Sequence, residues 1–134
     1  MFTKDKVKNH DVIYPELSYK IVGILFDVYN KMGYGYQEKY YQKAISIKLQ
    51  EAKLIFKEQY PIKIILDDDK IGNYFSDFII DNKIILEIKK MDRFLKGNID
   101  QTYAYLKSTK LKLGILANFT KKGLQFKRIV NLNS

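Results

Sequence analysis

Three charged residues lie within the two apolar halves of a stretch between residues 73 and 90, whose halves meet at Asp81 and Asn82. Asp77 lies in the first half of this stretch, and Glu87 and Lys89 lie in the second half. Both halves have the composition of β-strands. Because a strand alternates its two faces, Glu87 and Lys89 share one face. Charged groups in so apolar a setting cost desolvation energy, so they form either a solvated surface pair or a functional site.

The length of the loop between the two strands decides where Asp77 lies. If residues 81–83 form the loop, Asp77 lies directly opposite Glu87, with Cβ atoms about 5 Å apart. A two-residue loop would instead set Asp77 opposite Leu86, because a slip of one residue turns every side chain to the other face. A site built from both carboxylates therefore requires a loop of odd length or a bulge.

Two facing carboxylates repel each other unless a cation lies between them. Oxygen ligands favour a hard ion, so we expect Mg²⁺ or Mn²⁺ at Asp77 and Glu87. Lys89 is then placed to neutralise charge on a phosphate or to orient a water molecule. An aspartate, a glutamate and a lysine on adjoining strands predict a metal-dependent site that cleaves phosphodiester bonds.

The composition predicts one soluble globular domain. The chain has 134 residues, of which 46% are hydrophobic and none is cysteine. It has no apolar run of the roughly 20 residues that a membrane span needs, and its first residues do not resemble a signal peptide. Without cysteine, disulfides and thiolate zinc sites are excluded. We expect a cytoplasmic protein that does not bind membranes.

The charge balance suggests a polyanionic partner. Lysine and arginine number 24 against 15 acidic residues, which gives a net charge of +9, and nucleic acid is the commonest partner of such a surface. The alternative is the codon bias of an AT-rich genome, because nearly all the basic residues are lysine. The single histidine, His10, falls in a polar leading segment, which leaves little basis for Ser-His or Cys-His catalysis.

Hydrophobic periodicity predicts an α/β fold. Residues 1–16 form a polar arm, and residues 17–134 form a single domain. Ser18 is the expected N-cap of the first helix. A polar turn at residues 67–70 and a loop at 91–96 separate the later elements. The expected order is two helices, three strands, a helix and two strands, which describes a mixed sheet flanked by helices. In this order the elements are expected at residues 18–32, 36–52, 54–66, 73–80, 84–89, 98–108, 112–118 and 125–130.

This order, with an aspartate on one strand and Glu-x-Lys on the next, resembles the PD-(D/E)xK nuclease superfamily and its restriction-endonuclease-like core. The segment Gly35-x-x-Glu38-x-x-Tyr41 is similar to the signature of the GxxExxY protein family, a small bacterial branch of that superfamily. The resemblance covers about residues 17–131. Further blocks similar to that family follow in its order: Tyr74–Asp77, Leu86–Lys89, Gln101–Lys107, Gly114–Phe119 and Lys127–Ile129.

The resemblance implies roles for particular residues. Glu38, Asp77 and Glu87 would be metal ligands, with the backbone carbonyl of Ile88 as a further contact. Lys89 would stabilise the scissile phosphate or position the attacking water.

From the following helix, Gln101 would lie beside the site, with Tyr105 either supporting it or only packing. Ser76 replaces the proline that usually precedes the first aspartate of the motif. Taken without the resemblance, Glu38 is equally well explained as a solvated charge at a helix N-terminus.

The expected activity is metal-dependent hydrolysis of nucleic acid, with DNA as the favoured substrate. A second hypothesis is a non-catalytic nucleic-acid-binding or interaction module that keeps the fold. A third is a structural role, in which Asp77, Glu87 and Lys89 form a salt-bridged cluster. A homodimer would suit an enzyme that cuts two strands, although no segment of the sequence indicates an interface.

Overall fold

The computed structural model describes residues 13–133. The predicted order of helices and strands is confirmed, and the two boundaries that differ most lie at the start of the first helix and the start of the second strand. The predicted arm lies mostly outside the described residues, as does His10. The elements are α2 (Pro15–Met32), α3 (Glu38–Glu51), β1 (Phe56–Leu66), β2 (Asp69–Ile80), β3 (Ile84–Lys89), α4 (Lys96–Thr109), β4 (Leu113–Thr120) and β5 (Gly123–Val130).

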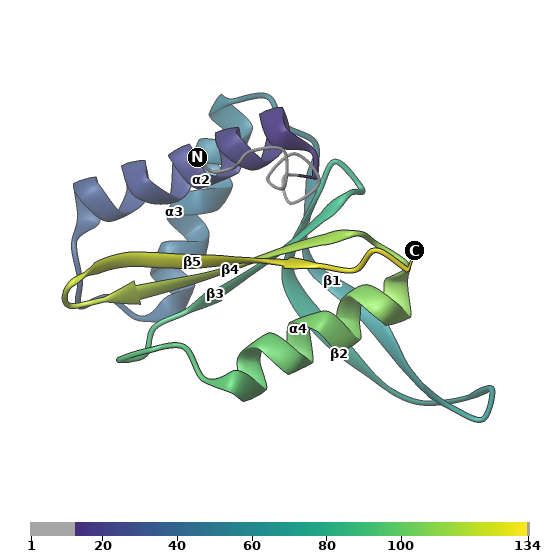
Figure 1. Cartoon of the computed structure of the whole chain (residues 1–134). Coiled ribbons are helices and arrows are strands. Elements are labelled where there is room, and N and C mark those ends of the chain that lie inside the picture. Colours follow the sequence, from purple (N-terminus) through teal and green to yellow (C-terminus); the bar gives the residue numbers. More distant parts are fainter. Residues whose placement is uncertain (1–12, 134) are drawn as a thin grey trace, which may run out of the picture.

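The strands form one mixed sheet in the order β1-β2-β3-β4-β5. All neighbours are antiparallel except β3 and β4, which are parallel. A parallel pair cannot be joined by a tight turn, and α4 provides the crossover. Figure 1 shows α2 and α3 on one side of the sheet and α4 on the other. The predicted mixed sheet flanked by helices is therefore confirmed.

Alternation along the buried strand β3 divides the core in two. Leu86 and Ile88 belong to the cluster packed against α2 and α3, whereas Ile85 belongs to the cluster packed against α4. Helix α4 approaches the sheet closely at Gly114, where an added Cβ would lie 2.9 Å from the Thr102 Cγ2 atom. Both faces of β3 are thus covered, and Glu87 on it is removed from solvent.

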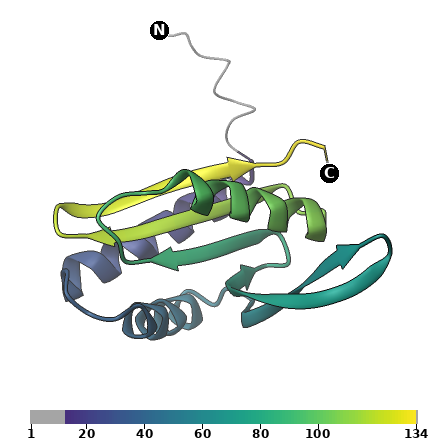
Figure 2. The same cartoon turned by 90° about the horizontal axis from the view of Figure 1, so that it is seen from below.

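The β1–β2 hairpin projects beyond the helices (Figure 2). It is longer than predicted, because β2 begins at Asp69 rather than at residue 73. Pro61 lies on β1, which is an edge strand. An edge strand tolerates a residue without a backbone N–H, so Pro61 is accommodated within β1.

The start of the first helix differs from the prediction. Helix α2 begins at Pro15, whose fixed φ suits a first helical turn, and its N-cap is Tyr14. The expectation that Ser18 caps the helix is wrong, because Ser18 is buried one turn inside it and accepts a hydrogen bond from Arg128 Nε at 2.8 Å.

Among the described residues, no helix is long and apolar enough to cross a membrane.

Candidate active site

The loop between β2 and β3 has three residues. Ile80 pairs with Ile84, and the chain reverses through Asp81 and Asn82, whose φ angles are 55° and 53°. Aspartate and asparagine adopt positive φ more readily than most residues. The loop of odd length is confirmed, and its register places Asp77 against Glu87.

At Asp77 and Glu87, hydrogen bonds to side chains take the place of main-chain hydrogen bonds between β2 and β3. Regular pairing of β2 with β3 ends at Phe78 and Leu86. Beyond it, the Asp77 N–H donates to Glu87 Oε2 at 3.1 Å, and the Ile88 N–H donates to Asp77 Oδ2 at 2.7 Å. Each carboxylate is therefore held by the opposite strand, which fixes the orientation of both.

Two neutral side chains complete this arrangement. The Tyr74 hydroxyl donates to Glu87 Oε1 at 2.8 Å, and Gln42 Nε2 donates to Asp77 Oδ1 at 3.1 Å. The Tyr74 ring is itself stacked on Tyr105, with centroids 4.1 Å apart. All four carboxylate oxygens of Asp77 and Glu87 thus accept a hydrogen bond.

Gln42 and Tyr74 were not among the predicted site residues. Gln42 lies four residues after Glu38, and this spacing places both on one face of a helix, so the sequence held a signal for it. Tyr74 has no comparable signal, because alternation along a strand would put residues 74 and 77 on opposite faces.

Glu38 reaches the site from α3, which lies on the side of the sheet opposite to α4. It is the first residue of α3, and its Oε2 atom accepts a hydrogen bond from the Lys90 N–H at 3.1 Å. Its charge is near enough to raise the pKa of Asp77. The start of α3 therefore lies beside the end of β3, and Glu38 joins the carboxylates of the hairpin.

The remaining residues of the Gly35-x-x-Glu38-x-x-Tyr41 segment position this helix start. Tyr41 is buried, and its ring is stacked on Phe119 at 4.1 Å. Its hydroxyl donates to the Gly33 carbonyl at 2.6 Å. Gly35 has a φ of 123°, which side chains disfavour. The glycine and the tyrosine thereby shape the turn that delivers Glu38.

Burial dominates the electrostatics of the two carboxylates. Glu87 is only 2% exposed, and this burial, followed by repulsion from Asp77, raises its pKa to about 7. Burial also raises the pKa of Asp77, although the Ile88 N–H opposes the shift. The charge of Lys89 favours ionisation of both groups. Within residues 13–133, however, Lys89 forms no ion pair with either one.

Asn118 holds the chain that follows Lys89. The two residues are partners in the β3–β4 ladder, and Asn118 is fully buried. Its side-chain amide accepts from the Met91 N–H at 2.9 Å and donates to the Met91 carbonyl at 3.0 Å. This pair of bonds fixes the exit of β3, and with it the position of Lys89 and Lys90.

Gln101 lies farther from the carboxylates than the other predicted residues. It is exposed on α4 and lines, with Tyr105, a hollow of about 570 Å³ between α4 and β1. Its link to Glu87 runs through Tyr105 and then Tyr74. The structure thus places Asp77 against Glu87, with Lys89 following on β3 and Glu38 bonded to the exit of that strand, and it places Gln101 at their margin.

The donor atoms suit a hard divalent cation, although they do not form a preassembled cage. In the described part of the chain, no three acidic or histidine side chains converge in an arrangement that could hold a metal ion. Each carboxylate oxygen keeps a second lone pair after accepting one hydrogen bond. The fully buried Ser76 Oγ, next to Asp77, has no hydrogen-bond partner within residues 13–133. Oxygen ligands and an unsatisfied hydroxyl both fit a hydrated ion of this class.

Comparison with known proteins gives one family match. The family model described as the PD-(D/E)XK nuclease superfamily matches residues 15–129. No curated protein matches.

Two solved structures are similar to this chain. The crystal structure of SSO0001 is 16% identical, with a TM-score of 0.47 over 87% of this chain and 78% of that one. An alkaline exonuclease (LHK-Exo) from Laribacter hongkongensis is 10% identical, with a TM-score of 0.49 over 87% of this chain and 83% of that one.

Proposed function

Because the chain belongs to the PD-(D/E)XK nuclease superfamily, we propose that it is a metal-dependent nuclease that hydrolyses phosphodiester bonds of DNA. The observation that carries this proposal is the pair Asp77 and Glu87, a half-buried and a buried carboxylate locked across β2 and β3. Burying two such groups side by side is costly without a compensating cation. A function that supplies the cation explains why the chain keeps them.

The site residues would have separate roles in hydrolysis. Asp77, Glu87, Glu38 and the Ile88 carbonyl would hold the ion. Mg²⁺ or Mn²⁺, when bound, would polarise the phosphate and lower the pKa of an attacking water. Lys89 offsets the negative charge that develops on the phosphate during attack.

Other residues keep this arrangement in place. Tyr74 and Gln42 hold the carboxylates in their orientations, because ligands need such supporting hydrogen bonds. Gln101 is placed to contact the nucleic acid from α4.

The finer identity follows from the same residues. We assign the chain to the GxxExxY branch because Gly35, Glu38 and Tyr41 each have a distinct structural task around the start of α3. The net charge of +9 is suited to a polyanionic substrate. A bacterial cytoplasmic location and a homodimer stay predictions from the sequence.

Cleavage assays test the proposal. Wild type and Glu87→Gln are incubated with single- and double-stranded DNA and RNA in Mg²⁺, Mn²⁺ or EDTA, with Glu51→Gln as a control for an exposed carboxylate on α3. We expect wild type and Glu51→Gln to cut DNA only with metal, and Glu87→Gln to be slower by on the order of 1,000-fold.

Two other results would contradict the proposal. If no nucleic acid is cut but binding weakens steeply with salt, the chain is a non-catalytic nucleic-acid-binding module. If Glu87→Gln unfolds the protein instead of inactivating it, the carboxylates form a structural cluster.

A further inference from the structure

The loop between α2 and α3 is held rigidly and displays tyrosines. Gly33 and Gly35 have φ angles of 73° and 123°. The buried Tyr41 hydroxyl donates to the Gly33 carbonyl and accepts from the Tyr36 N–H at 3.4 Å. Hydrogen bonds to the buried Tyr41 therefore help fix the backbone that carries Tyr34 and Tyr36.

Three tyrosines in and after this loop are exposed. Tyr34, Tyr36 and Tyr40 are 36%, 47% and 51% exposed. Tyr36 and Tyr40 line a largely apolar hollow of about 300 Å³ on the outer side of α3. The Tyr36 ring makes a T-shaped contact with Tyr41, with centroids 6.0 Å apart, and nearly half of the residue is still exposed.

Lysines accompany the tyrosines. Lys90 Nζ lies 5.3 Å from the centre of the Tyr34 ring, and Lys39 Nζ lies 5.3 Å from the centre of the Tyr40 ring. Lys43 lines the hollow. Within the described range, none of these three lysines forms an ion pair with a carboxylate. Their charge is thus available to phosphate groups, which a purely apolar docking surface would not favour.

This surface meets the carboxylate site at Lys90 and the start of α3. The main-chain N–H of Lys90 donates to Glu38, whereas its side chain lies over Tyr34. Glu38 turns toward the sheet, and Tyr40, two residues later, lies on the other side of the helix. A strand leaving the site would therefore pass over the start of α3 and meet the tyrosines.

We propose that this tyrosine face, formed by Tyr34, Tyr36 and Tyr40 with Lys39, Lys43 and Lys90, binds the unpaired bases of single-stranded nucleic acid. Aromatic rings beside lysines stack on bases while the charges follow the backbone. In a duplex the base faces are already stacked on each other, so these rings have nothing to contact. The inference rests on the proposed function and adds that the substrate is a single strand or an overhang.

Binding without cleavage tests the inference. A fluorescent oligothymidine, a fluorescent oligouridine and a blunt DNA duplex are titrated in EDTA, with anisotropy as the readout. We expect the Tyr36→Ala/Tyr40→Ala variant to bind at least one of the single strands about 10- to 100-fold more weakly than wild type, with little change for the duplex. The Tyr36→Phe/Tyr40→Phe variant keeps the rings and should bind like wild type.

Tyr19→Ala is the matched control. Tyr19 is 79% exposed near the start of α2, whereas the hollow includes Met32 at the end of that helix. It should not change single-strand binding. Circular dichroism and thermal unfolding of each variant show that the fold is kept, as expected for exposed side chains. Equal weakening for single strand and duplex, or no weakening for either, would overturn the inference.

The binding assay is independent of the cleavage assay. If wild type cuts nucleic acid with metal but the double alanine variant binds single strands normally, the proposal for the tyrosine face is wrong and the proposed nuclease activity is supported. If the double alanine variant loses single-strand binding but wild type cuts nothing, the nuclease is wrong and the tyrosine face stands.

Discussion

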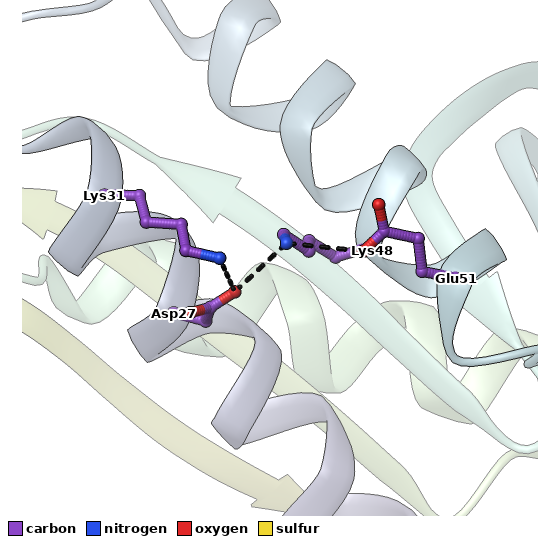
Figure 3. A network of polar contacts seen from close by, with 4 residues as sticks. All are labelled: Asp27, Lys31, Lys48 and Glu51. Atoms are coloured by element: carbon purple, nitrogen blue, oxygen red, sulfur yellow. Dashed lines mark hydrogen bonds and ion pairs between the residues drawn. The ribbon is translucent and has the colours of Figure 1, made fainter.

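Two clusters of carboxylates in this protein are built in opposite ways. One lies on the surface between α2 and α3, where Asp27 Oδ2 is 3.2 Å from Lys31 Nζ and 3.4 Å from Lys48 Nζ, and Lys48 also reaches Glu51 (Figure 3). The other is the pair Asp77 and Glu87, whose oxygens accept hydrogen bonds from neutral donors. The first cluster has its counter-charges in contact, whereas the second has the charge of Lys89 nearby but, within residues 13–133, no ion pair.

For this reason the pKa values of the carboxylates in the two clusters are shifted in opposite directions. The hydrogen bond from Lys31 is the main cause that lowers the pKa of Asp27, whereas burial is the main cause that raises the pKa of Asp77 and Glu87. A paired surface charge contributes little to stability. A buried charge without a partner is costly. The proposed binding of a divalent cation would account for this contrast.

The largest expected effect is on stability as a function of pH. The folded-state pKa of Glu87 is about 7 against an ordinary 4.5, so between these values the folded chain binds more protons than the unfolded chain. Stability should therefore fall as pH rises through this window, by up to about 3 kcal/mol from Glu87. Urea unfolding in EDTA at a series of pH values measures this loss.

Glu87→Gln serves as the control for that series. It removes the titrating group, so the difference in unfolding free energy between wild type and variant should change across the window and level off above it. Above pH 7, Mg²⁺ or Mn²⁺ should stabilise wild type and leave the variant unchanged. A difference that does not vary with pH would show that Glu87 is not buried as a costly charge.

The second prediction concerns Tyr74→Phe, which removes one neutral donor and keeps the ring stacked on Tyr105. The Tyr74 hydroxyl favours the ionised form of Glu87, so its loss should raise the pKa of Glu87 further. We expect cleavage to slow by about 10-fold, with the acidic limb of the pH–rate profile moved to higher pH. Tyr103→Phe, on α4, is the matched control. A slower rate without movement of that limb would assign Tyr74 a purely structural role.

The sequence limited the strand register to two alternatives, because a few residues determine it. Apolar residues flank Asp81 and Asn82 on both sides, and a loop of three residues there sets Asp77 against Glu87. The alternation along β3 then assigns Leu86 and Ile88 to one face and Glu87 to the other. Such local patterns depend only on the strand period, which is why this part of the site could be predicted.

The rest of the site depends on tertiary contacts that local patterns do not contain. Gln42 is 35 residues from Asp77 in sequence, and their contact exists only because α3 packs across the sheet. Ser18 was expected at a helix end, whereas its partner is Arg128 on β5. Glu38 was predicted through family resemblance, since as an isolated residue it could not be distinguished from a solvated charge at a helix N-terminus.

The smallest expected effect comes from breaking the surface cluster. In Asp27→Asn, Lys31 returns to solvent and Lys48 keeps Glu51, so no charge is stranded in the interior. The urea midpoint should equal that of wild type at physiological salt and fall slightly at low salt, where screening is weak. It should also show none of the pH dependence expected between wild type and Glu87→Gln. If Asp27→Asn instead destabilised the protein strongly at physiological salt, pairing with lysine would be a source of stability in this protein. The lack of such pairing at Asp77 and Glu87 would then no longer by itself point to a ligand.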